Sequence, residues 1–329
     1  MADVAKLAGV SSQTVSRVSN GHPGVIGSTR EQVLAAMRQL GYRPNSAARA
    51  LRYGKFNTIG VILFDLSSIG NSRTVEAIAT HAAAEGYAIT LIPLDVPTQD
   101  SVLGAFTRMG ELAVDAVIII METRLPDNGT VTLPPGVHAV VVNSDAGDRY
   151  SVVDTDQAQG ARLAVGHLLD LGHRTVWHVA GPESSFAAQT RAKTWRLVLE
   201  EAGRPVPPQL SGDWSAESGY VAGLRLAEEP DCTAVFAAND QMAMGLLRAF
   251  HERGRSVPGD ISVVGFDDFS EAAFCIPPLT TIHQDFAEVG RRCVQGVLRQ
   301  IREGGALPPG TDLVPLRLVV RDSSASPAR

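Results

Sequence analysis

The sequence predicts an α/β protein that opens with a small helical head. Apolar residues recur at helical spacing through the first part of the chain. From Thr58 onward, short β-branched apolar runs alternate with helical stretches, and the alternation repeats too often for one sheet. We therefore expect a three-helix head followed by a body of two doubly wound α/β subdomains.

The opening stretch, residues 3–21, reads DVAKLAGVSSQTVSRVSNG. Val4, Leu7 and Ala8 fall on one apolar stripe of a short helix. Gly9 is expected to end this helix by adopting a left-handed conformation, which glycine reaches without steric cost. A second helix is expected to follow almost at once.

The second helix is predicted to carry polar side chains on its outer face. Ser11 is a suitable N-cap, and Val15 and Val18 point inward. The outward residues include Ser12, Gln13 and Arg17. Two short helices with a glycine-containing turn between them indicate a helix-turn-helix, a motif that reads the DNA major groove. An ordinary helical hairpin with a solvated outer face is the alternative.

A third helix is predicted to complete the head. Ser28 and Glu31 have the spacing of a capping box, and Gly41 is expected to stop the helix. The predicted buried stripe consists of Val33, Leu34, Met37 and Leu40. Together with the first two helices, this stripe would enclose a small core of valine and leucine side chains.

Charge is distributed unevenly along the 329 residues, although the net charge is only −6. Residues 1–55 hold eight Lys and Arg against two acids, whereas the remainder holds 21 bases and 33 acids. Because phosphate neutralisation supplies most non-specific affinity for nucleic acid, a polyanionic partner is expected for the head alone.

The segment after the head, GYRPNSAARAL, is rich in alanine but short. Pro44 interrupts the chain, and the stretch behind it has too few residues to stay helical alone in water. A linker that folds only when something holds it is therefore expected. Leu51 at its end either packs on the head or has a role of its own.

Strands and helices alternate through the body. The strand candidates are 58–64, 88–94, 116–120, 139–142, 175–180, 234–238 and 261–265. The helical stretches lie near 73–86, 100–112, 157–171, 187–203, 217–229, 240–254 and 285–303. Open parallel sheets bind ligands at the carboxyl ends of their strands, so polar residues just past the strands are the candidates for a site.

Such polar residues follow several of the strands. They are Asp65, Asn143, Asn239, Asp240, Asp267 and Asp268, with Arg191 and Gln284 farther from a strand end. Trp214 and Phe286 add aromatic faces. Carboxylate, carboxamide and guanidinium groups beside flat apolar rings suit a ligand rich in hydroxyl groups. As alternatives, Asp240 and Asp268 cap helices, Trp214 is a core residue and Arg191 is a surface charge.

Motifs of common catalytic and cofactor sites are missing from the sequence. The spacing of Gly21, Gly24 and Gly27 does not fit a dinucleotide fingerprint, and no Walker A, GxSxG or HExxH pattern occurs. The three cysteines are scattered without ligand or disulfide spacing. No enzyme activity, cofactor or metal site is therefore expected. Without a signal peptide or a long apolar run, we expect a cytoplasmic protein with no membrane span.

The chain resembles the LacI/GalR family of transcriptional regulators along essentially its whole length. The resemblance rests on DVAKLAGVSSQTVSRVSNG and GYRPNSAARAL near the start and on GDWSA, ANDQMAMG, DISVVGFDD and IPPLTTIHQDF in the body. It implies a repressor whose DNA binding is controlled by a sugar effector, a galactoside or related glycoside that acts as inducer. The implied fold is a helix-turn-helix head with a periplasmic-binding-protein-like body of two subdomains.

The resemblance also implies roles for individual residues. The base-reading residues would be Ser12, Gln13 and Arg17. The minor-groove hinge would involve Leu51, Ala47 and Ala50. The effector contacts would be Asn143, Arg191, Trp214, Asn239, Asp267, Gln284 and Phe286. The partners would be a near-palindromic double-stranded DNA operator, the sugar, and a second copy of the chain in a homodimer.

The expected domains are a head at 1–44, a hinge at 45–56 and a body at 57–329. Within the body, one subdomain would comprise about 57–154 and 287–315, and the other about 155–284 and 316–329. The chain ends without leucine heptads, which favours a dimer over a tetramer. The head begins abruptly at Met1, where relatives carry several residues ahead of the first helix, so a start at Met1 and a start upstream of it both stay open.

Some residues depart from the family pattern. Asn143 stands where a strongly similar member carries a carboxylate, and Ser68, Gly70 and Asn71 replace bulkier apolar residues, so the sugar is expected to differ in size or linkage. Two rival interpretations remain, a sugar-processing enzyme with a helical head and a secreted solute-binding protein. The missing catalytic motifs argue against the first, and the missing signal peptide and cationic head against the second.

Overall fold

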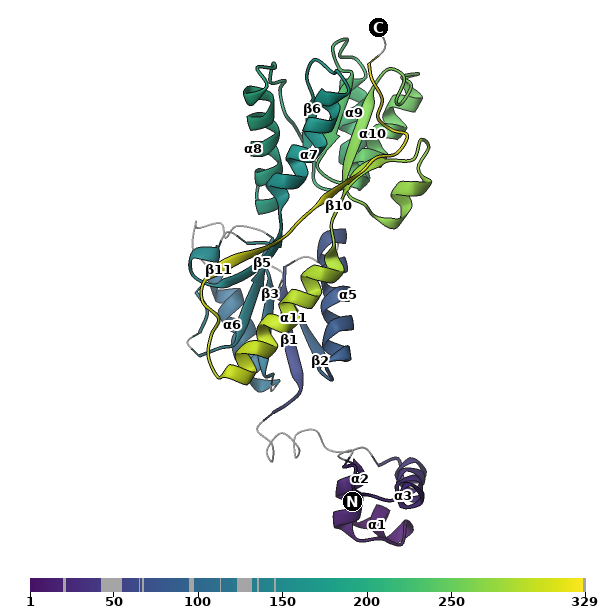
Figure 1. Ribbon diagram of the computed structural model, residues 1–329, viewed down its shortest axis with the longest axis vertical. Helices are drawn as coiled ribbons and strands as arrows, with labels where there is room; N and C mark the ends of the chain where they lie inside the picture. The colour runs from purple at the N-terminus through teal and green to yellow at the C-terminus, as the bar shows by residue number, and fades with distance from the viewer. Residues whose placement is uncertain are drawn as a thin grey trace. The chain divides into compact units, whose positions relative to one another are not determined.

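The computed structural model describes residues 1–19, 22–42, 55–64, 66, 68–94, 98–112, 114–122, 132–134, 136–144 and 146–327. Contacts within the chain separate two compact units, Met1–Phe56 and Asn57–Arg329. The first unit is helical, and the described strands all belong to the second (Figure 1). We refer to these units as the head and the body.

In the described part of the head, three helices enclose one core. They are α1 (Ala2–Leu7), α2 (Ser12–Ser19) and α3 (Gly27–Gln39). Gly9 in the turn between α1 and α2 has a φ of 65°, which confirms its predicted left-handed conformation. Ser11 Oγ accepts a hydrogen bond from the Thr14 backbone N–H at 3.1 Å and so caps α2 as predicted. The core consists of Val4, Ala5, Val15, Val18, Val33, Ala36 and Met37.

The predicted buried stripe of the third helix is confirmed at Val33 and Met37 and wrong at Leu34 and Leu40, which are exposed. Leu7 of α1, also predicted on an apolar stripe, is exposed as well. The buried residues of α3 are Val33, Ala36 and Met37. With 3.6 residues per turn, a single stripe of α3 faces the other two helices, and Leu34 lies beside that stripe. Leu40 follows the end of the helix.

The predicted capping box of Ser28 and Glu31 is wrong as well. The third helix begins two residues earlier than this box requires, at Gly27, and its N-cap residue Ile26 has no side-chain acceptor. Its first turn is closed by the backbone hydrogen bond from the Arg30 N–H to the Ile26 carbonyl at 3.0 Å.

The described strands of the body form two six-stranded sheets, which define a first and a second subdomain. The first sheet is parallel, with the order β11-β5-β4-β3-β1-β2. Its strands are β1 (Thr58–Leu63), β2 (Ala88–Pro93), β3 (Ala116–Ile120), β4 (Ala139–Val142), β5 (Ser151–Thr155) and β11 (Gly310–Val314).

The second sheet has the order β12-β10-β9-β8-β6-β7, and β12 at its edge runs antiparallel to β10. Its strands are β6 (Trp177–Ala180), β7 (Leu210–Ser211), β8 (Ala234–Ala237), β9 (Ser262–Asp267), β10 (Thr280–His283) and β12 (Arg317–Val319). The seven predicted strands are all present, with ends within two residues of the prediction. The prediction missed β5, β7, β10, β11 and β12, which are short or carry polar residues that interrupt the apolar run.

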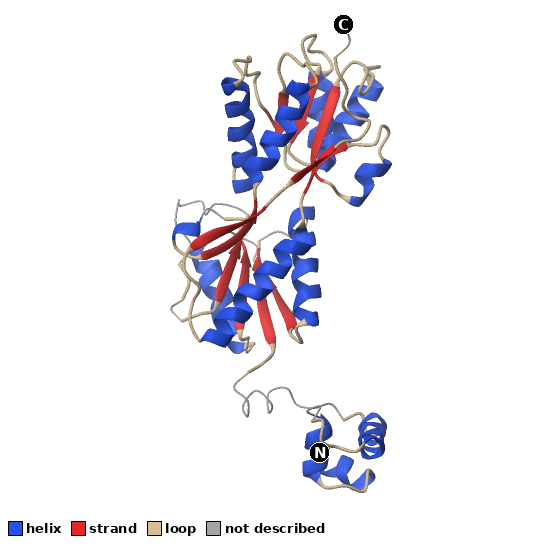
Figure 2. Cartoon of the chain, in the orientation of Figure 1, coloured by secondary structure: helices blue, strands red, loops and turns tan. Residues whose placement is uncertain are grey.

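Helices cover both faces of each sheet (Figure 2). The first sheet lies between α6 (Gln99–Glu111) on one face and the pair α5 (Ile69–Ala84) and α11 (Phe286–Glu303) on the other. The second sheet lies between α7 (Gln157–Asp170) with α8 (Phe186–Glu201) and α9 (Ala216–Leu226) with α10 (Asp240–Glu252). Short 3-10 helices, η1 (Ala146–Asp148) and η2 (Ser270–Phe274), complete the described elements. The predicted doubly wound α/β fold with two subdomains is thereby confirmed.

Along the described chain, the backbone passes between the two subdomains three times. The crossover segments are 155–157 from β5 to α7, 284–286 from β10 to α11, and 315–316 from β11 to β12. Figure 1 shows the last of these as the yellow chain between the label of β11 and the second subdomain. Because α11 follows β10 yet packs on the first sheet, neither subdomain is a continuous stretch of sequence.

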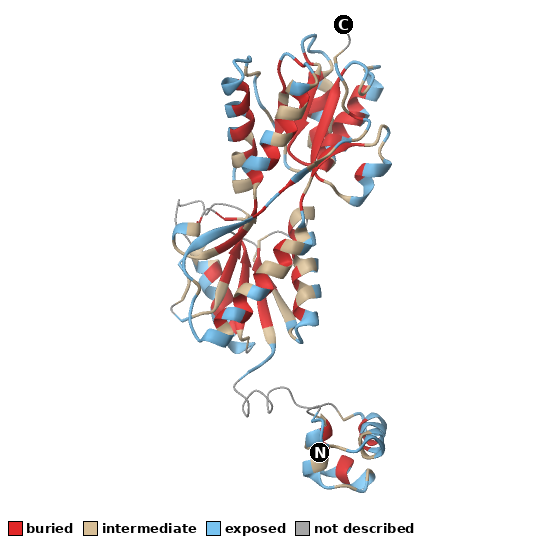
Figure 3. Cartoon of the chain, in the orientation of Figure 1, coloured by how far each residue is buried: buried red, intermediate tan, exposed pale blue. Residues whose placement is uncertain are grey.

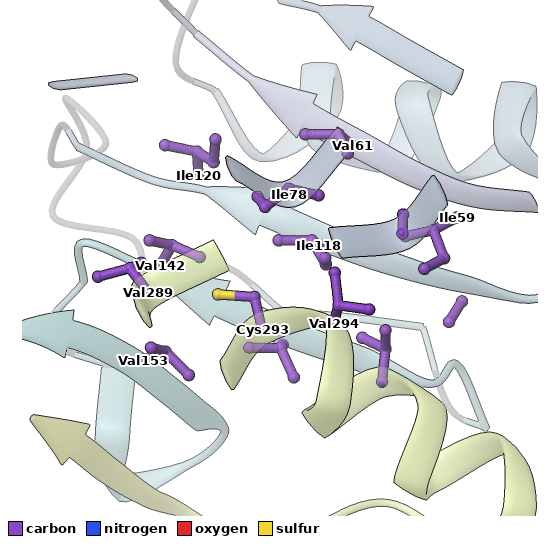
Figure 4. Packing of buried hydrophobic residues seen from close by; sticks show 14 of the residues in the cluster. Ile59, Val61, Ile78, Ile118, Ile120, Val142, Val153, Val289, Cys293 and Val294 are labelled. Atoms are coloured by element: carbon purple, nitrogen blue, oxygen red, sulfur yellow. The ribbon is translucent and has the colours of Figure 1, made fainter. Parts of the chain in front are cut away.

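The buried residues concentrate in the sheets and on the helix faces that cover them (Figure 3). In the first subdomain, Val289, Cys293 and Val294 of α11 pack toward Ile118 and Val142 of the sheet (Figure 4). This apolar contact joins α11, near the C-terminal end of the chain, to strands that lie more than 140 residues earlier in the sequence. It therefore stabilises the crossovers as well as the sheet. Among the described residues, no helix combines the length and the apolar character that crossing a bilayer requires.

Candidate functional site

A cavity of about 380 Å³ is lined by residues from both subdomains of the body. Its lining includes all seven residues that the resemblance implied as effector contacts. The first subdomain provides Asn143 and Phe286, the second provides Arg191, Trp214, Asn239 and Asp267, and Gln284 lies in a crossover segment. The structure therefore brings the whole predicted set together around one space.

The ends of parallel strands explain how these distant residues meet. Asn143 directly follows β4, Asp267 is the last residue of β9, and Asn239 comes two residues after β8. Asn239 also caps α10, since its Oδ1 accepts a hydrogen bond from the Met242 N–H at 2.9 Å. The cap orients the Asn239 side chain at the rim of the second sheet.

Arg191 places a positive charge inside the protein, with only 4% of the residue exposed. Its Nε donates to Gln157 Oε1 at 2.8 Å, and its Nη1 donates to the carbonyl oxygen of Ala238. Nη1 also lies 3.9 Å from Asp267 Oδ1. Burial lowers the pKa of Arg191, and the neighbouring Asp267 carboxylate opposes that shift. The alternative of an ordinary surface charge is therefore wrong.

Asp267 faces Arg191 from the end of β9 and is 8% exposed. Burial raises the pKa of Asp267 from 3.8 to about 6, while Arg191 and the hydrogen bond from Gln284 act in the opposite direction. Its φ of 115° lies in a region that residues with a side chain rarely adopt. Backbone angles of this kind cluster at ligand-binding and active sites.

Hydrogen bonds link these two charges through two of the three crossover segments, 155–157 and 284–286. Gln157, which accepts from Arg191, donates from Nε2 to Thr155 Oγ1 at 2.7 Å. Thr155 Oγ1 donates to Gln284 Oε1 at 2.6 Å, and Gln284 Nε2 donates to Asp267 Oδ1 at 2.6 Å. The charges of the cavity are thus connected to two of the segments in which the chain passes between the subdomains.

Trp214 provides an aromatic wall of the cavity. Its φ is 73°, unusual for a bulky residue, and its carbonyl oxygen accepts from Asn239 Nδ2 at 2.9 Å. The Arg191 guanidinium carbon lies 5.6 Å from the Trp214 ring centroid and 3.6 Å from that of Phe266. A Cβ atom at Gly181 would come within 2.3 Å of the indole, so glycine there permits its position. Trp214 is only partly buried and also packs on the core of the second subdomain.

The first subdomain lines the cavity with polar groups of its own. Asn71 of α5 is 2% exposed, and its Nδ2 donates to Glu122 Oε2 at 2.5 Å. Glu122 follows β3, and its backbone carbonyl accepts a hydrogen bond from the N–H of Phe186, the first residue of α8, at 3.1 Å. This backbone hydrogen bond joins the two subdomains beside the cavity.

On the head, α2 presents the predicted base-reading residues to solvent. Ser12, Gln13 and Arg17 are exposed, whereas Val15 and Val18 of the same helix are buried. Gln13 and Arg17 are four residues apart and so lie on one face. The hinge residues Leu51, Ala47 and Ala50 and the strand-end residue Asp65 lie outside the described residues.

Family models match two parts of the chain. Residues 1–45 match "Bacterial regulatory proteins, lacI family", and residues 165–324 match "Periplasmic binding protein-like domain". The chain is 36% identical to the lactose operon repressor of Escherichia coli (strain K12), over 99% of this chain and 90% of that protein. The chain belongs to the LacI family of bacterial regulatory proteins.

Other members of the LacI family support the same assignment. The ribose operon repressor of Escherichia coli (strain K12) is 31% identical over 92% of this chain and 93% of that protein. A crystal structure of the lac repressor dimer bound to operator and the anti-inducer ONPF covers 98% of both chains, with a TM-score of 0.84 and 34% identity. These relatives are repressors and not enzymes. This LacI-family chain is accordingly a DNA-binding transcriptional repressor with a ligand-binding body.

Sequence reasoning missed several residues that line the cavity of this LacI-family body. They include Glu122, Thr155, Gln157 and Gln241. Ser68, Gly70 and Asn71, which were expected to alter the size of the sugar, line the cavity as well. Glu122 comes two residues after a predicted strand, so its position was a usable signal. Gln241 Nε2 is buried without a hydrogen-bond partner among the described residues, although Gln241 Oε1 accepts from Asn239 Nδ2 at 2.8 Å. Only the tertiary structure could reveal Gln157 and Thr155, because they bond across the crossovers.

Two carboxylates near the strand ends have structural partners instead of helix-capping roles. Asp240 accepts from Thr281 Oγ1 at 2.6 Å and from the Phe269 N–H at 3.0 Å, and Asp268 accepts from Arg321 Nη2 at 2.7 Å. The capping alternatives for these two residues are therefore wrong. Within the described part of the chain, no group of three or more His, Cys, Asp and Glu is placed to hold a metal ion.

Proposed function

We propose that the cavity binds a sugar, a galactoside or a related glycoside, and that this sugar controls binding of the repressor to its operator. The observation that carries the proposal is the buried pair of Arg191 and Asp267, with Asn239 and the Trp214 ring around the same cavity. A carboxylate and a guanidinium suit neighbouring hydroxyl groups, and an indole face suits the C–H side of a sugar ring. The relative named for the lactose operon supports a sugar of this class.

We propose that the chain acts as a homodimer on a near-palindromic operator, in the cytoplasm where that DNA lies. The exposed face of α2 would enter the major groove, with Gln13 suited to adenine and Arg17 to guanine, and with Ser12 beside them. The resemblance assigns Leu51 to a wedge in the minor groove, with Ala47 and Ala50 allowing two hinge helices to approach closely. The operator-bound lac repressor dimer supports this arrangement.

Sugar binding would act through the crossover segments. A ligand bound to both subdomains favours one relative orientation of them, and the network through Gln157, Thr155 and Gln284 links the bound charges to two crossovers. A coupling free energy of about 1 to 3 kcal/mol would change operator affinity about 5- to 150-fold. We propose induction, in which the sugar releases the operator.

Two measurements test the proposed function. Thermal unfolding is followed with a panel of mono- and disaccharides, because a ligand that binds only the folded protein raises its stability. A gel-shift titration with a selected operator then follows DNA release as the active sugar is added. The proposal fails if no sugar stabilises the protein, and the inducing sign is reversed if sugar tightens operator binding. Turnover of the sugar by the purified protein would establish the rival enzyme.

A further inference from the structure

Arg191 has an aromatic neighbour behind the wall of the cavity. The guanidinium carbon of Arg191 lies 3.6 Å from the centroid of the Phe266 ring, well inside the distance of about 6 Å within which a ring face attracts a cation. Phe266 is 0% exposed and is not one of the described residues that line the cavity. The ring therefore supports the guanidinium from the protein side, and a ligand in the cavity would not contact it.

Hydrogen bonds within the protein engage only part of the Arg191 guanidinium. The group donates through Nε, Nη1 and Nη2 and has no acceptor of its own. Nε donates to Gln157 Oε1 at 2.8 Å, and Nη1 donates to the carbonyl oxygen of Ala238. Among the described residues, Nη2 has no acceptor, so it is the group that remains available to a ligand in the cavity. The orientation of the guanidinium plane decides where these remaining hydrogens point.

Phe266 and Asp267 are consecutive residues at the end of β9, yet both approach Arg191. Consecutive side chains of a regular strand point to opposite faces of the sheet. The φ of 115° at Asp267 departs from strand geometry, which allows the two side chains to meet the same group. At 3.9 Å the Asp267 oxygen is too far from Nη1 for a direct hydrogen bond, so it supplies a countercharge. The flat ring face supplies a surface on which the planar guanidinium can stack.

The Phe266 ring is itself held in place. A Cβ atom at Gly160 of α7 would come within 2.6 Å of both Phe266 Cζ and Leu316 Cδ1, so glycine at this position admits the edge of the ring. Phe236 contacts Phe266 with ring centroids 6.3 Å apart and the planes tilted by 48°. Leu316 belongs to the third crossover segment. The ring therefore joins Arg191 to the crossover that the hydrogen-bond network does not include.

The positive charge over these rings comes from Arg191 and not from His178. The His178 ring stacks on Phe236 with centroids 4.8 Å apart. Burial lowers the pKa of His178 to about 4, and the charge of Arg191 acts in the same direction. At neutral pH the imidazole is therefore uncharged, and it neither repels the guanidinium nor competes with it for a ring face.

We propose that Phe266 is a positioning residue for effector binding, whose ring face holds the Arg191 guanidinium so that Nη2 points to the ligand. The inference rests on the proposed function, because it concerns the same cavity. The alternative is a core residue alone, since Phe266 belongs to the apolar cluster between the second sheet and the helices α7 and α8. The two roles differ in one property. Core packing depends on the volume of the side chain, whereas attraction of a cation depends on the electron density of the ring face.

Stepwise fluorination of the ring tests the proposal, because fluorine withdraws electron density from the ring face with little change in shape. Phe266 of the full-length protein is replaced by mono-, di- and trifluorinated phenylalanine. Calorimetry with galactose and with lactose measures the sugar affinity of each protein. We expect the affinity to fall with each added fluorine, by about tenfold in total.

The matched control is the same series at Phe250, which is fully buried in the other apolar cluster of the second subdomain. Fluorination there changes a core ring that has no guanidinium over it, so we expect sugar affinity within about twofold of the parent. Affinity that stays constant along the Phe266 series would overturn the positioning role and leave the proposed function standing. An equal decline along both series would overturn it as well.

Thermal unfolding without sugar tests the contact independently of the ligand. We expect the melting temperature to fall along the Phe266 series, and to fall no more than in the Phe250 series once Arg191→Met is combined with Asp267→Asn. This double substitution removes the cation and its buried countercharge together. A decline that is the same with and without Arg191 would overturn the cation–π contact. If neither sugar binds the parent but the melting temperature depends on Arg191 as expected, the proposed function has failed and the contact itself is confirmed.

Discussion

Arg191 Nη1 lies 3.9 Å from Asp267 Oδ1, and each residue is more than nine-tenths buried. The distance exceeds that of a direct charge-assisted hydrogen bond, and each group has a further partner, the Ala238 carbonyl for Arg191 and Gln284 for Asp267. Burying two charges costs several kcal/mol for each ion, and this spaced pair recovers only part of that cost. A ligand whose hydroxyl groups bond to both Arg191 and Asp267 would offset more of this desolvation cost. The cost of burying the two charges in the unliganded cavity therefore contributes to the affinity for such a ligand.

Arg191→Ala is expected to abolish the sugar response and to destabilise the body by about 3 kcal/mol, because Asp267 then remains buried without its countercharge. Operator binding without sugar should be retained, since Arg191 lies in the body. Thermal unfolding, calorimetry with the active sugar and a gel shift measure the three quantities. The matched control is Arg174→Ala, whose Nη2 lies 3.0 Å from Asp231 Oδ2 in an exposed pair that contributes little. Similar losses of stability in both variants would contradict the role of burial.

Sugar affinity is expected to fall as the pH drops below about 6. Burial raises the pKa of Asp267 to about 6, and protonation removes the charge that accepts hydroxyl hydrogens. Because a single carboxylate is protonated, sugar affinity is expected to fall by up to about tenfold for each pH unit below that pKa. Calorimetry between pH 5 and pH 8 measures this dependence of sugar affinity on pH. Proteins are most stable at about pH 5 to 8, so unfolding does not interfere. Asp267→Asn should bind weakly with little pH dependence, and a parallel decline in both proteins would point to another group.

The stability of the sugar-free protein should change with pH in the opposite direction. The folded state raises the pKa of Asp267 from 3.8 to about 6, so it binds the proton more tightly than the unfolded chain does. The contribution of Asp267 to the free energy of unfolding therefore decreases as the pH rises from about 4 to about 6, and it is constant above about pH 6. Denaturant unfolding at several pH values measures this slope, and Asp267→Asn should reduce it. A slope unchanged in the variant would argue against the assignment.

Gly181→Ala is expected to weaken sugar binding about tenfold, because its Cβ would come within 2.3 Å of the Trp214 indole and displace the ring. Calorimetry with the active sugar measures the change. Gly166→Ala is the control, since no atom lies within 4 Å of its added Cβ and the residue is inside α7. That substitution should stabilise the body by about 0.5 to 1 kcal/mol without altering affinity. Equal affinity in the two variants would show that the Trp214 position is not needed.

Gln13→Ala and Arg17→Ala should each weaken specific operator binding by about 1 to 3 kcal/mol, since each would remove a bidentate contact to a base. Binding to unrelated DNA should change much less, so the ratio of the two affinities is the decisive measurement. Gln39→Ala, at the exposed end of α3, is the control. If the substitutions weaken both kinds of DNA equally, these residues contact phosphates and not bases.

Leu51→Ala tests the wedge that the resemblance implies. We expect a loss of operator affinity of at least about tenfold with sugar affinity unchanged, because the wedge would contact DNA alone. Leu103→Ala, an exposed leucine of α6, controls for loss of an apolar side chain elsewhere. Gel shifts and calorimetry on the same preparations separate the two affinities. Operator binding equal to that of the parent would exclude the wedge.

Local pattern accounted for most of the regular structure. The strand β3 and the helix α7 were predicted almost residue for residue, because each has an uninterrupted pattern of its own period. The strands β11 and β12 were missed, since they are short edge strands whose pairing depends on partners far away in sequence. In the head, the predicted stripe of α3 was wrong at Leu34 and Leu40, because the side of the helix that is buried depends on where the other helices lie.

The sequence alone determined the fold class, the polar side chains at the strand ends and, through its motifs, the family. Those features depend on local periodicity and on residue identity, which a single chain displays directly. Only the tertiary structure decided that Arg191 is buried against Asp267, and that Gln157 and Thr155 connect them across the crossovers. It also revealed that Asn71 donates a hydrogen bond to Glu122 on the wall of the cavity. Burial and hydrogen bonding depend on residues that are distant in sequence but close in space. These contacts can therefore be identified only once the folded arrangement of the two subdomains is known.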